Sequence, residues 1–257
     1  MLLVIDVGNT NIVIGVYQGE SLLHDWRLRT EKDITEDEFH IILQSLFSAD
    51  KATLEAIDAT VISCVVPPMR KNLHSFCTKY LHTPPVWIDA STYKGMPILY
   101  DNPDEVGADR IVNAVAAFKK YKTSLVVVDF GTATTFDCIS REGAYLGGAI
   151  SPGLLISAEA LFQKASKLPR VEIFVKPKSV IAKNTIDSMN AGIVFGYAGL
   201  VDSMVDRIKK EMSPTPKVIA TGGLAQVMSD VARTIEVVEP HLSLEGLRII
   251  FEDMTGA

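Results

Sequence analysis

The sequence carries the same strand-and-turn pattern twice. VIDVGNTN (Val4–Asn11) is echoed by VVDFGTAT (Val127–Thr134). In each copy an apolar run ends in aspartate, and a glycine two residues later opens a turn into a second β-branched strand. One Asp-x-Gly alone is a common hairpin, because the aspartate can satisfy backbone donors of its own turn. Two copies in matching surroundings indicate two lobes built on one plan.

The elements around the two copies follow the same order. Strands are predicted at Leu2–Asp6, Ile12–Tyr17, Leu22–Arg29, Ala59–Val66 and Val86–Asp89, with helices over Phe39–Phe47 and Pro68–Tyr80. The second half restarts with strands at Leu125–Asp129, Thr134–Ile139, Tyr145–Ile150, Lys217–Thr221 and Glu236–Val238, and helices over Asp109–Tyr121, Leu154–Ser166, Thr185–Lys210 and Leu224–Arg233. This predicts an α/β fold of duplicated actin-like (ribonuclease H-like) βββαβαβ lobes, residues 1–115 and 116–257, with a nucleotide cleft between them. The irregular stretch Lys164–Asn184 fits either a substrate-facing loop or a surface crossing.

Charge and composition narrow the classes of partner. The formal net charge is −6, and the paired lysines lie at the polar ends of helical patterns, which argues against a nucleic-acid partner. Three cysteines without CxxC spacing read as buried thiols in a reducing compartment. The start, MLLVID, is not a signal peptide, and no apolar run approaches the roughly 20 residues that cross a bilayer. We therefore expect a cytoplasmic protein that does not bind membranes.

The two Asp-x-Gly turns are candidate phosphate sites. An acid at the end of a buried strand can hold a hydrated metal ion near a phosphate, while the glycine lets the backbone approach closely. A third glycine turn is Thr221–Ala225 (TGGLA). It has two equally good interpretations, a backbone surface on which adenine or ribose lies, or simply a tight turn between a strand and a helix. The P-loop, GxGxxG, HExxH and GxSxG motifs are absent, and the five scattered histidines read as structural.

Two further stretches follow each other closely, Tyr100–Pro103 (YDNP) and Gly107–Arg110 (GADR). The second of them places an acid, Asp109, beside an arginine. Asp109 falls in the first turn of a helix, where the helix dipole favours an acid in any case. The same acid suits a second task, the orientation of an acceptor hydroxyl. The residues alone leave both readings open.

Taken together, these motifs resemble the type III pantothenate kinases. The similarity runs through DVGNTN, YDNP…GADR, DFGTATT, GGAISPG (Gly147–Gly153), Lys183–Asp202, TGGLA and LSLEGL (Leu242–Leu247), so it covers almost the whole chain. It implies transfer of the ATP γ-phosphate to the primary hydroxyl of pantothenate, the first step of coenzyme A biosynthesis. It also implies a homodimer in which the partner subunit completes the pantothenate pocket.

The resemblance assigns roles to particular residues. It implies ATP contacts at Asp6, Val7, Gly8, Asn9, Thr10, Asn11, Ile12, Val13 and Thr132, with Asp6 near Mg²⁺. Asp129 would help to hold a monovalent cation, K⁺ or NH₄⁺. The pantothenate pocket would be lined by Tyr100, Gly107, Ala108, Asp109, Arg110 and Thr185, and Asp109 would be the general base.

Three alternatives differ from this interpretation. A sugar or acetate kinase of the same superfamily would share Asp6, Asp129 and TGGLA but not the acceptor pocket around Tyr100 and Thr185. A non-catalytic regulatory relative would be expected to lack Asp6 or Asp109, and both are present. An actin-like ATPase that works by assembly or clamp motion would carry further subdomains, for which the chain is short.

Overall fold

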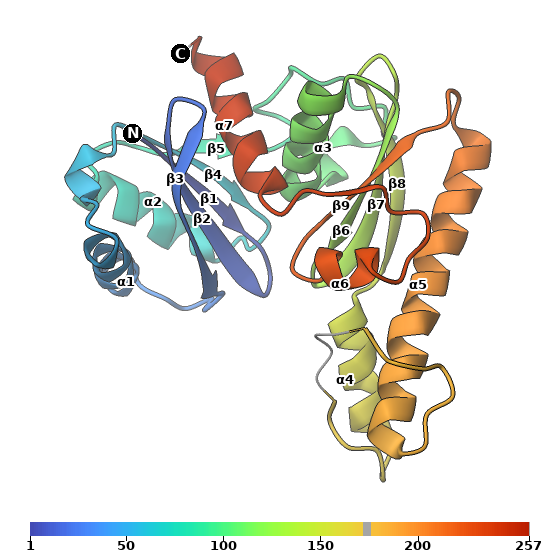
Figure 1. The fold of residues 1–257 in the computed structure, drawn as a ribbon. Coiled ribbons are helices and arrows are strands. Elements are labelled where there is room, and N and C mark those ends of the chain that lie inside the picture. The colour runs from blue at the N-terminus through green and yellow to red at the C-terminus, as the bar shows by residue number, and fades with distance from the viewer. Residues whose placement is uncertain (172–175, 257) are drawn as a thin grey trace. The chain divides into compact units, whose positions relative to one another are not determined.

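The computed structural model describes residues 1–171 and 176–256. Contacts between residues divide the chain into two compact units. The first comprises Met1–Met96, Asp101–Ala116 and Leu242–Ala257, and the second comprises Pro97–Tyr100 and Ala117–His241. Each unit contains one five-stranded mixed sheet (Figure 1).

The first strand of the chain lies in the middle of the first sheet. Its order is β3 (Ser21–Arg29), β2 (Asn11–Gln18), β1 (Leu2–Val7), β4 (Ala59–Cys64) and β5 (Val86–Ile88). β1 runs antiparallel to β2 and parallel to β4, so its carboxyl end lies beside that of β4. Side chains alternate across a strand, and Leu3, Ile5 and Val7 therefore face one side of the sheet.

Helices α1 (Glu36–Ala49) and α2 (Met69–Tyr80) cover that side of the sheet (Figure 1). Their buried residues, such as Phe39 and Phe76, pack with Leu3, Ile5 and Val7 into one apolar core. The start of α1 is fixed by a capping box, in which Thr35 and Glu38 satisfy each other's backbone N–H groups. This packing leaves the carboxyl ends of β1 and β4 at an edge of the core.

The last helix, α7 (Leu242–Thr255), packs against β1, β2 and β4 of the first sheet. Leu244 contacts the position of Gly15, where an added Cβ would lie 3.1 Å from its Cδ1. α7 also presses on α3 (Ala108–Tyr121), because a Cβ on Gly246 would lie 2.2 Å from the carbonyl oxygen of Val112. The end of the chain therefore completes the unit that the start of the chain began.

The second sheet repeats the plan. Its order is β10 (Val237–Val238), β9 (Lys217–Thr221), β6 (Leu125–Phe130), β7 (Ala133–Ile139) and β8 (Tyr145–Pro152). One face packs against α4 (Leu154–Lys164), α5 (Thr185–Glu211) and α6 (Ala225–Ser229), with Val194 and Val201 of α5 fully buried. α4 and the first part of α5 continue beyond the sheet as a helical pair (Figure 1).

The predicted order of elements is confirmed: the first half has βββαβαβ, and the second half has three strands, then α4 and α5, then β9, α6 and β10. The predicted helix Leu224–Arg233 was too long, since α6 ends at Ser229. Two short 3₁₀ turns, Leu54–Ala56 and Pro103–Glu105, were not predicted. Part of the irregular stretch Lys164–Asn184, residues 172–175, lies outside the described residues.

The compact units differ from the predicted lobes 1–115 and 116–257 at two places. α7 was not predicted as a helix, and its residues fall in the first unit because their apolar side chains pack on the first sheet. Pro97–Tyr100 falls in the second unit because Ile98 forms a parallel bridge with Tyr145 of β8. None of the helices in the described part of the chain is both long enough and apolar enough to span a bilayer.

The contact between α7 and α3 gives a stability prediction. Gly246→Ala forces a methyl group against the Val112 carbonyl, so we expect a loss of about 1–3 kcal/mol in the free energy of unfolding. Gly196→Ala is the matched control, because an added Cβ at this helical glycine of α5 meets nothing within 4 Å. The control should gain up to about 1 kcal/mol in urea denaturation, and equal behaviour of the two variants would contradict the packing described.

Candidate active site

Asp6 stands near the carboxyl end of the central strand β1. Its register partners are Val13 on β2 and Ser63 on β4. Ser63 is fully buried and donates its hydroxyl hydrogen bond to Asp6 Oδ1 at 2.8 Å. Ser243, in the first turn of α7, forms a second side-chain hydrogen bond with Asp6. Three elements therefore fix the orientation of this carboxylate.

Burial raises the pKa of Asp6 from 3.8 to about 6, and the like charge of Asp109 adds to that rise. The hydrogen bonds from Ser63 and Ser243, and the more distant charge of Arg27, lower it in part. Asp6 and Asp109 therefore lie close enough to repel each other within the first unit. A pair of crowded carboxylates gains stability when a cation or a proton reduces its charge.

Asp109 lies in the first turn of α3 and is bent back toward its own backbone. Its Oδ1 accepts a hydrogen bond from the N–H of Arg110 at 2.8 Å. A Cβ on Gly107 would lie 2.5 Å from the same oxygen, so only glycine leaves room for this conformation. Burial raises the pKa of Asp109, while the N–H and the guanidinium of Arg110 lower it in part. Of the predicted acceptor-pocket residues, Gly107–Arg110 thus lie together around this carboxylate.

The predicted ATP loop is a closed turn between β1 and β2. Gly8 donates its N–H to the carbonyl of Asn11 at 3.0 Å, and Thr30 braces the turn through the carbonyls of Gly8 and Thr10. Asn9 and Thr10 are exposed at its tip. Val7 and Ile12 are buried in the apolar core, so only their backbone atoms could meet a ligand.

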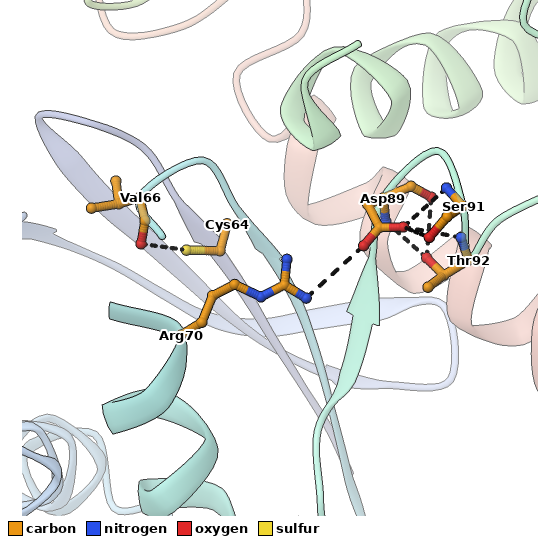
Figure 2. Close-up of polar contacts among 6 residues, drawn as sticks. All are labelled: Cys64, Val66, Arg70, Asp89, Ser91 and Thr92. Carbon is orange, nitrogen blue, oxygen red and sulfur yellow. Dashed lines mark hydrogen bonds and ion pairs between the residues drawn. The ribbon is translucent and has the colours of Figure 1, made fainter. Parts of the chain in front are cut away.

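The turns after β4 and β5 are fixed by a separate polar cluster (Figure 2). The Arg70 guanidinium stacks over the Trp87 ring at 4.5 Å and lies 3.9 Å from the Asp89 carboxylate. Burial acts to raise the pKa of Asp89, but hydrogen bonds from Ser91 and Thr92 outweigh it and lower that pKa. These contacts hold the strand ends beside Ser63.

Cys64, at the end of β4, forms a separate polar contact through its thiol. The thiol donates a hydrogen bond to the Val66 carbonyl at 3.3 Å, as Figure 2 shows. Burial raises the pKa of Cys64, which makes it a poor nucleophile. The expectation of three buried thiols is correct for Cys77 and Cys138, whereas Cys64 is partly exposed because it follows the last buried position of β4.

In the second unit Asp129 takes the place that Asp6 takes in the first. It is the penultimate residue of the central strand β6, between Thr135 on β7 and Thr221 on β9. Gly222, with φ +91°, brings backbone against it, and an added Cβ there would lie 2.4 Å from Asp129 Oδ1. The TGGLA turn therefore packs directly on this carboxylate, which neither sequence interpretation of the turn foresaw.

The two acids differ in their hydroxyl neighbours. Ser63 donates to Asp6, whereas the Thr221 hydroxyl donates to the carbonyl of Glu239 at 2.7 Å. The Thr132 carbonyl accepts the N–H of Gly153 at 3.1 Å, which closes the DFGTAT turn on the end of β8. Both turns are thus rigid, but their carboxylates have different surroundings.

The remaining acceptor-pocket candidates, Tyr100 and Thr185, lie apart within the second unit. Tyr100 is partly buried, with its ring centroid 6.4 Å from that of Tyr145. Thr185 is exposed at the start of α5, where Asn184 caps the helix. It lines a cavity of about 800 Å³ together with Leu161 of α4 and Met189 of α5.

Sequence reasoning missed two residues of the site, Ser63 and Ser243. Ser63 lay inside a strand that read as buried, and its position beside Asp6 depends on the strand order. Ser243 lies in LSLEGL, which was noticed only as part of the resemblance. The one signal available in the sequence was a small hydroxyl residue, Ser63, on the strand predicted to follow the one that carries Asp6.

Comparison with known proteins decides the family. A model of the Type III pantothenate kinase family matches residues 2–207. The chain belongs to this family. A type III pantothenate kinase of Desulfatibacillum aliphaticivorans is 62% identical over 257 residues, the whole of both chains. Another, of Geobacter sulfurreducens, is 57% identical over 252 residues, 98% of each chain.

Membership of the type III pantothenate kinases confirms that the chain is an enzyme and confirms the activity that its motifs predicted. Solved structures confirm the actin-like fold. A Campylobacter jejuni protein described as a Baf-family transcriptional activator has a TM-score of 0.61 at 20% identity, covering 99% of this chain and 100% of that one. A Sinorhizobium meliloti protein described as a 2-dehydro-3-deoxygalactonokinase has a TM-score of 0.59 at 11% identity, covering 100% and 98%. At these identities the likeness concerns the fold alone.

The raised pKa of Asp6 predicts how the stability of the protein depends on pH. An acid whose pKa is raised by folding destabilises the folded state above that pKa and has no such effect once both states are protonated. Asp6→Asn should therefore raise the free energy of unfolding by about 1–2 kcal/mol at pH 8, a value reduced for partial solvent exposure. The gain should shrink from pH 7 to pH 4.5 in urea titrations.

The matched control is Asp104→Asn, an exposed acid of the same unit. It should change stability by less than about 0.5 kcal/mol at every pH. A gain for Asp6→Asn that is the same at pH 4.5 and pH 8 would show that repulsion and burial of charge are not its cause.

Proposed function

We propose that Asp109 accepts the proton of the primary hydroxyl of pantothenate as that oxygen attacks the γ-phosphate of ATP. The observation that carries this proposal is the Asp6–Asp109 pair beside a closed glycine turn: burial raises the pKa of both carboxyl groups, and the charge of Asp109 adds to the rise at Asp6. Asp109 has its raised pKa from burial, which makes it a better base than an exposed aspartate. Its bent conformation, fixed by Arg110, defines where the hydroxyl is held.

The proton transfer comes late in the reaction. Phosphoryl transfer passes through a loose transition state, so positioning and charge stabilisation contribute more than full deprotonation of the alcohol. Asp109 therefore first orients the hydroxyl by accepting its hydrogen bond, and takes the proton as the new bond forms. Gly107 and Ala108 supply the tight backbone that lets the carboxylate reach this position.

The phosphates of ATP are assigned to the turn Gly8–Asn11 and to Thr132. Their backbone conformations are held by the hydrogen bonds from Thr30 and Gly153, so the donors are positioned before the nucleotide arrives. The residues of the first unit also fit Mg²⁺, because this ion takes one or two carboxylates and completes its shell with phosphate oxygens and water. Asp6 would hold it, and the ion would neutralise charge on the phosphates.

Asp129 is the carboxylate proposed for the monovalent cation. The fit rests on Gly222, where any side chain would occupy the space beside Asp129 Oδ1. Backbone and carboxylate oxygens are the ligands that hard cations prefer. Potassium or ammonium held there would offset negative charge near the Thr132 turn.

A homodimer is proposed from the exposed apolar surface of the second unit. Among the described residues nine large exposed hydrophobic side chains fall between positions 146 and 186, on β8, on α4, at the start of α5 and in the segment before it: Leu146, Ile150, Leu155, Ile156, Leu161, Phe162, Val180, Ile181 and Ile186. Such a concentration marks an interface. A second copy that covers α4 would close the cavity around Thr185, consistent with a pantothenate pocket completed by the partner subunit.

The alternatives have less support. A sugar or acetate kinase would share the fold but not the family to which the chain belongs. The described transcriptional role of the Campylobacter jejuni protein comes with 20% identity and carries no argument for this chain. The cytoplasmic location and the lack of nucleic-acid and membrane partners stay predictions of the sequence, and the three free cysteines are consistent with a reducing compartment.

The proposed base is tested by Asp109→Asn. The variant keeps the shape of the side chain and should fold normally, but it should lower kcat by about 10²–10⁴ because the amide cannot take the proton. The assay is pantothenate-dependent release of ADP by the purified protein with Mg²⁺ and K⁺. Asp104→Asn, an exposed acid on the preceding turn, is the control and should keep normal kcat. Near-normal kcat in Asp109→Asn would end the assignment.

The proposed dimer is tested with Leu155→Glu/Ile156→Glu on α4. Sedimentation of the native protein should give twice the 28.0 kDa of one chain, and the variant should sediment as a monomer because two charges replace apolar contacts. Its KM for pantothenate should rise more than its KM for ATP. Ile41→Glu, an equally apolar exposed site on α1, should stay dimeric. A monomeric native protein, or a dimeric double variant, would refute this interface.

A further inference from the structure

A buried tyrosine and a buried aspartate form a pair inside the second sheet. Tyr145 and Asp137 have no exposed surface, and the Tyr145 hydroxyl donates to Asp137 Oδ1 at 2.7 Å. The Thr135 hydroxyl donates to the other oxygen, Oδ2, at 2.8 Å. A carboxylate in the interior costs free energy even when hydrogen-bonded, and an apolar pair of equal volume is often at least as stable. The pair is therefore better explained by what it holds in place.

The backbone of Tyr145 holds the segment Pro97–Tyr100. Its N–H donates to the carbonyl of Pro97 at 2.8 Å, and its own carbonyl accepts the N–H of Leu99 at 2.8 Å. This bridge is the contact that places four residues in the second unit, although the chain on both sides of them belongs to the first. The position of the segment thus follows the position of Tyr145.

The side chain of Tyr100 is held by the same strand. Its ring is tilted 56° to that of Tyr145 at a centroid distance of 6.4 Å. Gly147, with φ +116°, forms the next contact, since a Cβ there would lie 3.5 Å from the Tyr100 ring. The β7–β8 register shifts at Cys138/Ile139, which pairs Tyr145 with Ile139. Such an irregularity re-aims a side chain, here toward Asp137.

We propose that Asp137 and Tyr145 are positioning residues for the acceptor substrate, which hold segment Pro97–Tyr100 and the Tyr100 ring in the conformation that binds it. The inference rests on the proposed function, in which Tyr100 lines the pantothenate pocket. The hydrogen bond to Asp137 prevents Tyr145 from shifting along β8, and Tyr145 transmits that restraint through two backbone hydrogen bonds and one ring contact. The ATP turns after β1 and β6 lie outside this chain of contacts.

The first test is Tyr145→Phe in the full-length enzyme, with KM measured separately for pantothenate and ATP. Removal of the hydroxyl alone should raise KM for pantothenate about 5- to 30-fold, while kcat and KM for ATP stay within threefold. Asp137→Asn should act in the same direction with a smaller change, because the amide oxygen can still accept one hydroxyl. A KM for pantothenate within twofold of the native value in both variants would overturn the proposal.

General destabilisation of the second unit is an alternative cause of a raised KM for pantothenate, so it needs a control variant. Val205→Ala removes buried volume from the opposite side of the second sheet, where α5 packs, and should lower the thermal midpoint by a similar amount. This variant should leave the ratio of the two KM values unchanged. If Val205→Ala raises KM for pantothenate as much as Tyr145→Phe does, the effect is general destabilisation and the positioning role is wrong.

A second measurement is independent of the substrate. Hydrogen exchange of the Leu99 amide, whose N–H is bonded to the Tyr145 carbonyl, should become about tenfold faster in Tyr145→Phe, with exchange in β6 unchanged. If the native enzyme does not phosphorylate pantothenate, the proposed function fails, yet faster exchange at Leu99 still supports the restraint on this segment. Unchanged exchange at Leu99 refutes the restraint whatever the substrate proves to be.

Discussion

Repulsion between Asp6 and Asp109 is the constraint on which the first unit depends. Burial favours protonation of both acids, and the charge of Asp109 adds to this at Asp6. The fold keeps the two carboxyl groups in place with hydroxyl groups from β4 and α7 and with the backbone of α3. Tight turns around the pair follow from the same need, because Gly107 and Gly8 let backbone and carboxylates share a small space. Because both carboxyl groups are buried, the arrangement lowers stability at neutral pH.

In the second unit an aspartate occupies the same strand position, but its surroundings differ. Asp129 lies near the carboxyl end of a central strand as Asp6 does, but its neighbours are two threonines and the bare backbone of Gly222. One duplicated plan has thus produced one carboxylate beside a second acid and one carboxylate beside peptide groups. The two similar turns therefore differ in local chemistry.

Local sequence patterns predicted most of the fold, because the central strands of each half are short buried apolar runs between turns and the helices show one apolar face. α7 was not predicted because its first buried residues, such as Leu244 and Leu247, were interpreted only as part of a family motif. Asp6, Asp109 and Asp129 could be proposed from the sequence because they stand at strand or helix ends. Ser63, Ser243 and the Asp137–Tyr145 pair could not be found in this way, since their roles arise from strand register and from contacts between distant parts of the chain.

The position of α7 has a consequence for synthesis of the protein. α7 leaves the ribosome after every strand of both sheets, and it packs on strands β1, β2 and β4 that left much earlier, so Ser243 reaches Asp6 only then. The second unit, in contrast, is formed from a nearly continuous stretch that is complete earlier, from Ala117 to His241. A nascent chain can therefore close its second sheet while the first still lacks one covering helix. The carboxylates of the first unit acquire their final surroundings only when α7 has been synthesised and has packed on the first sheet.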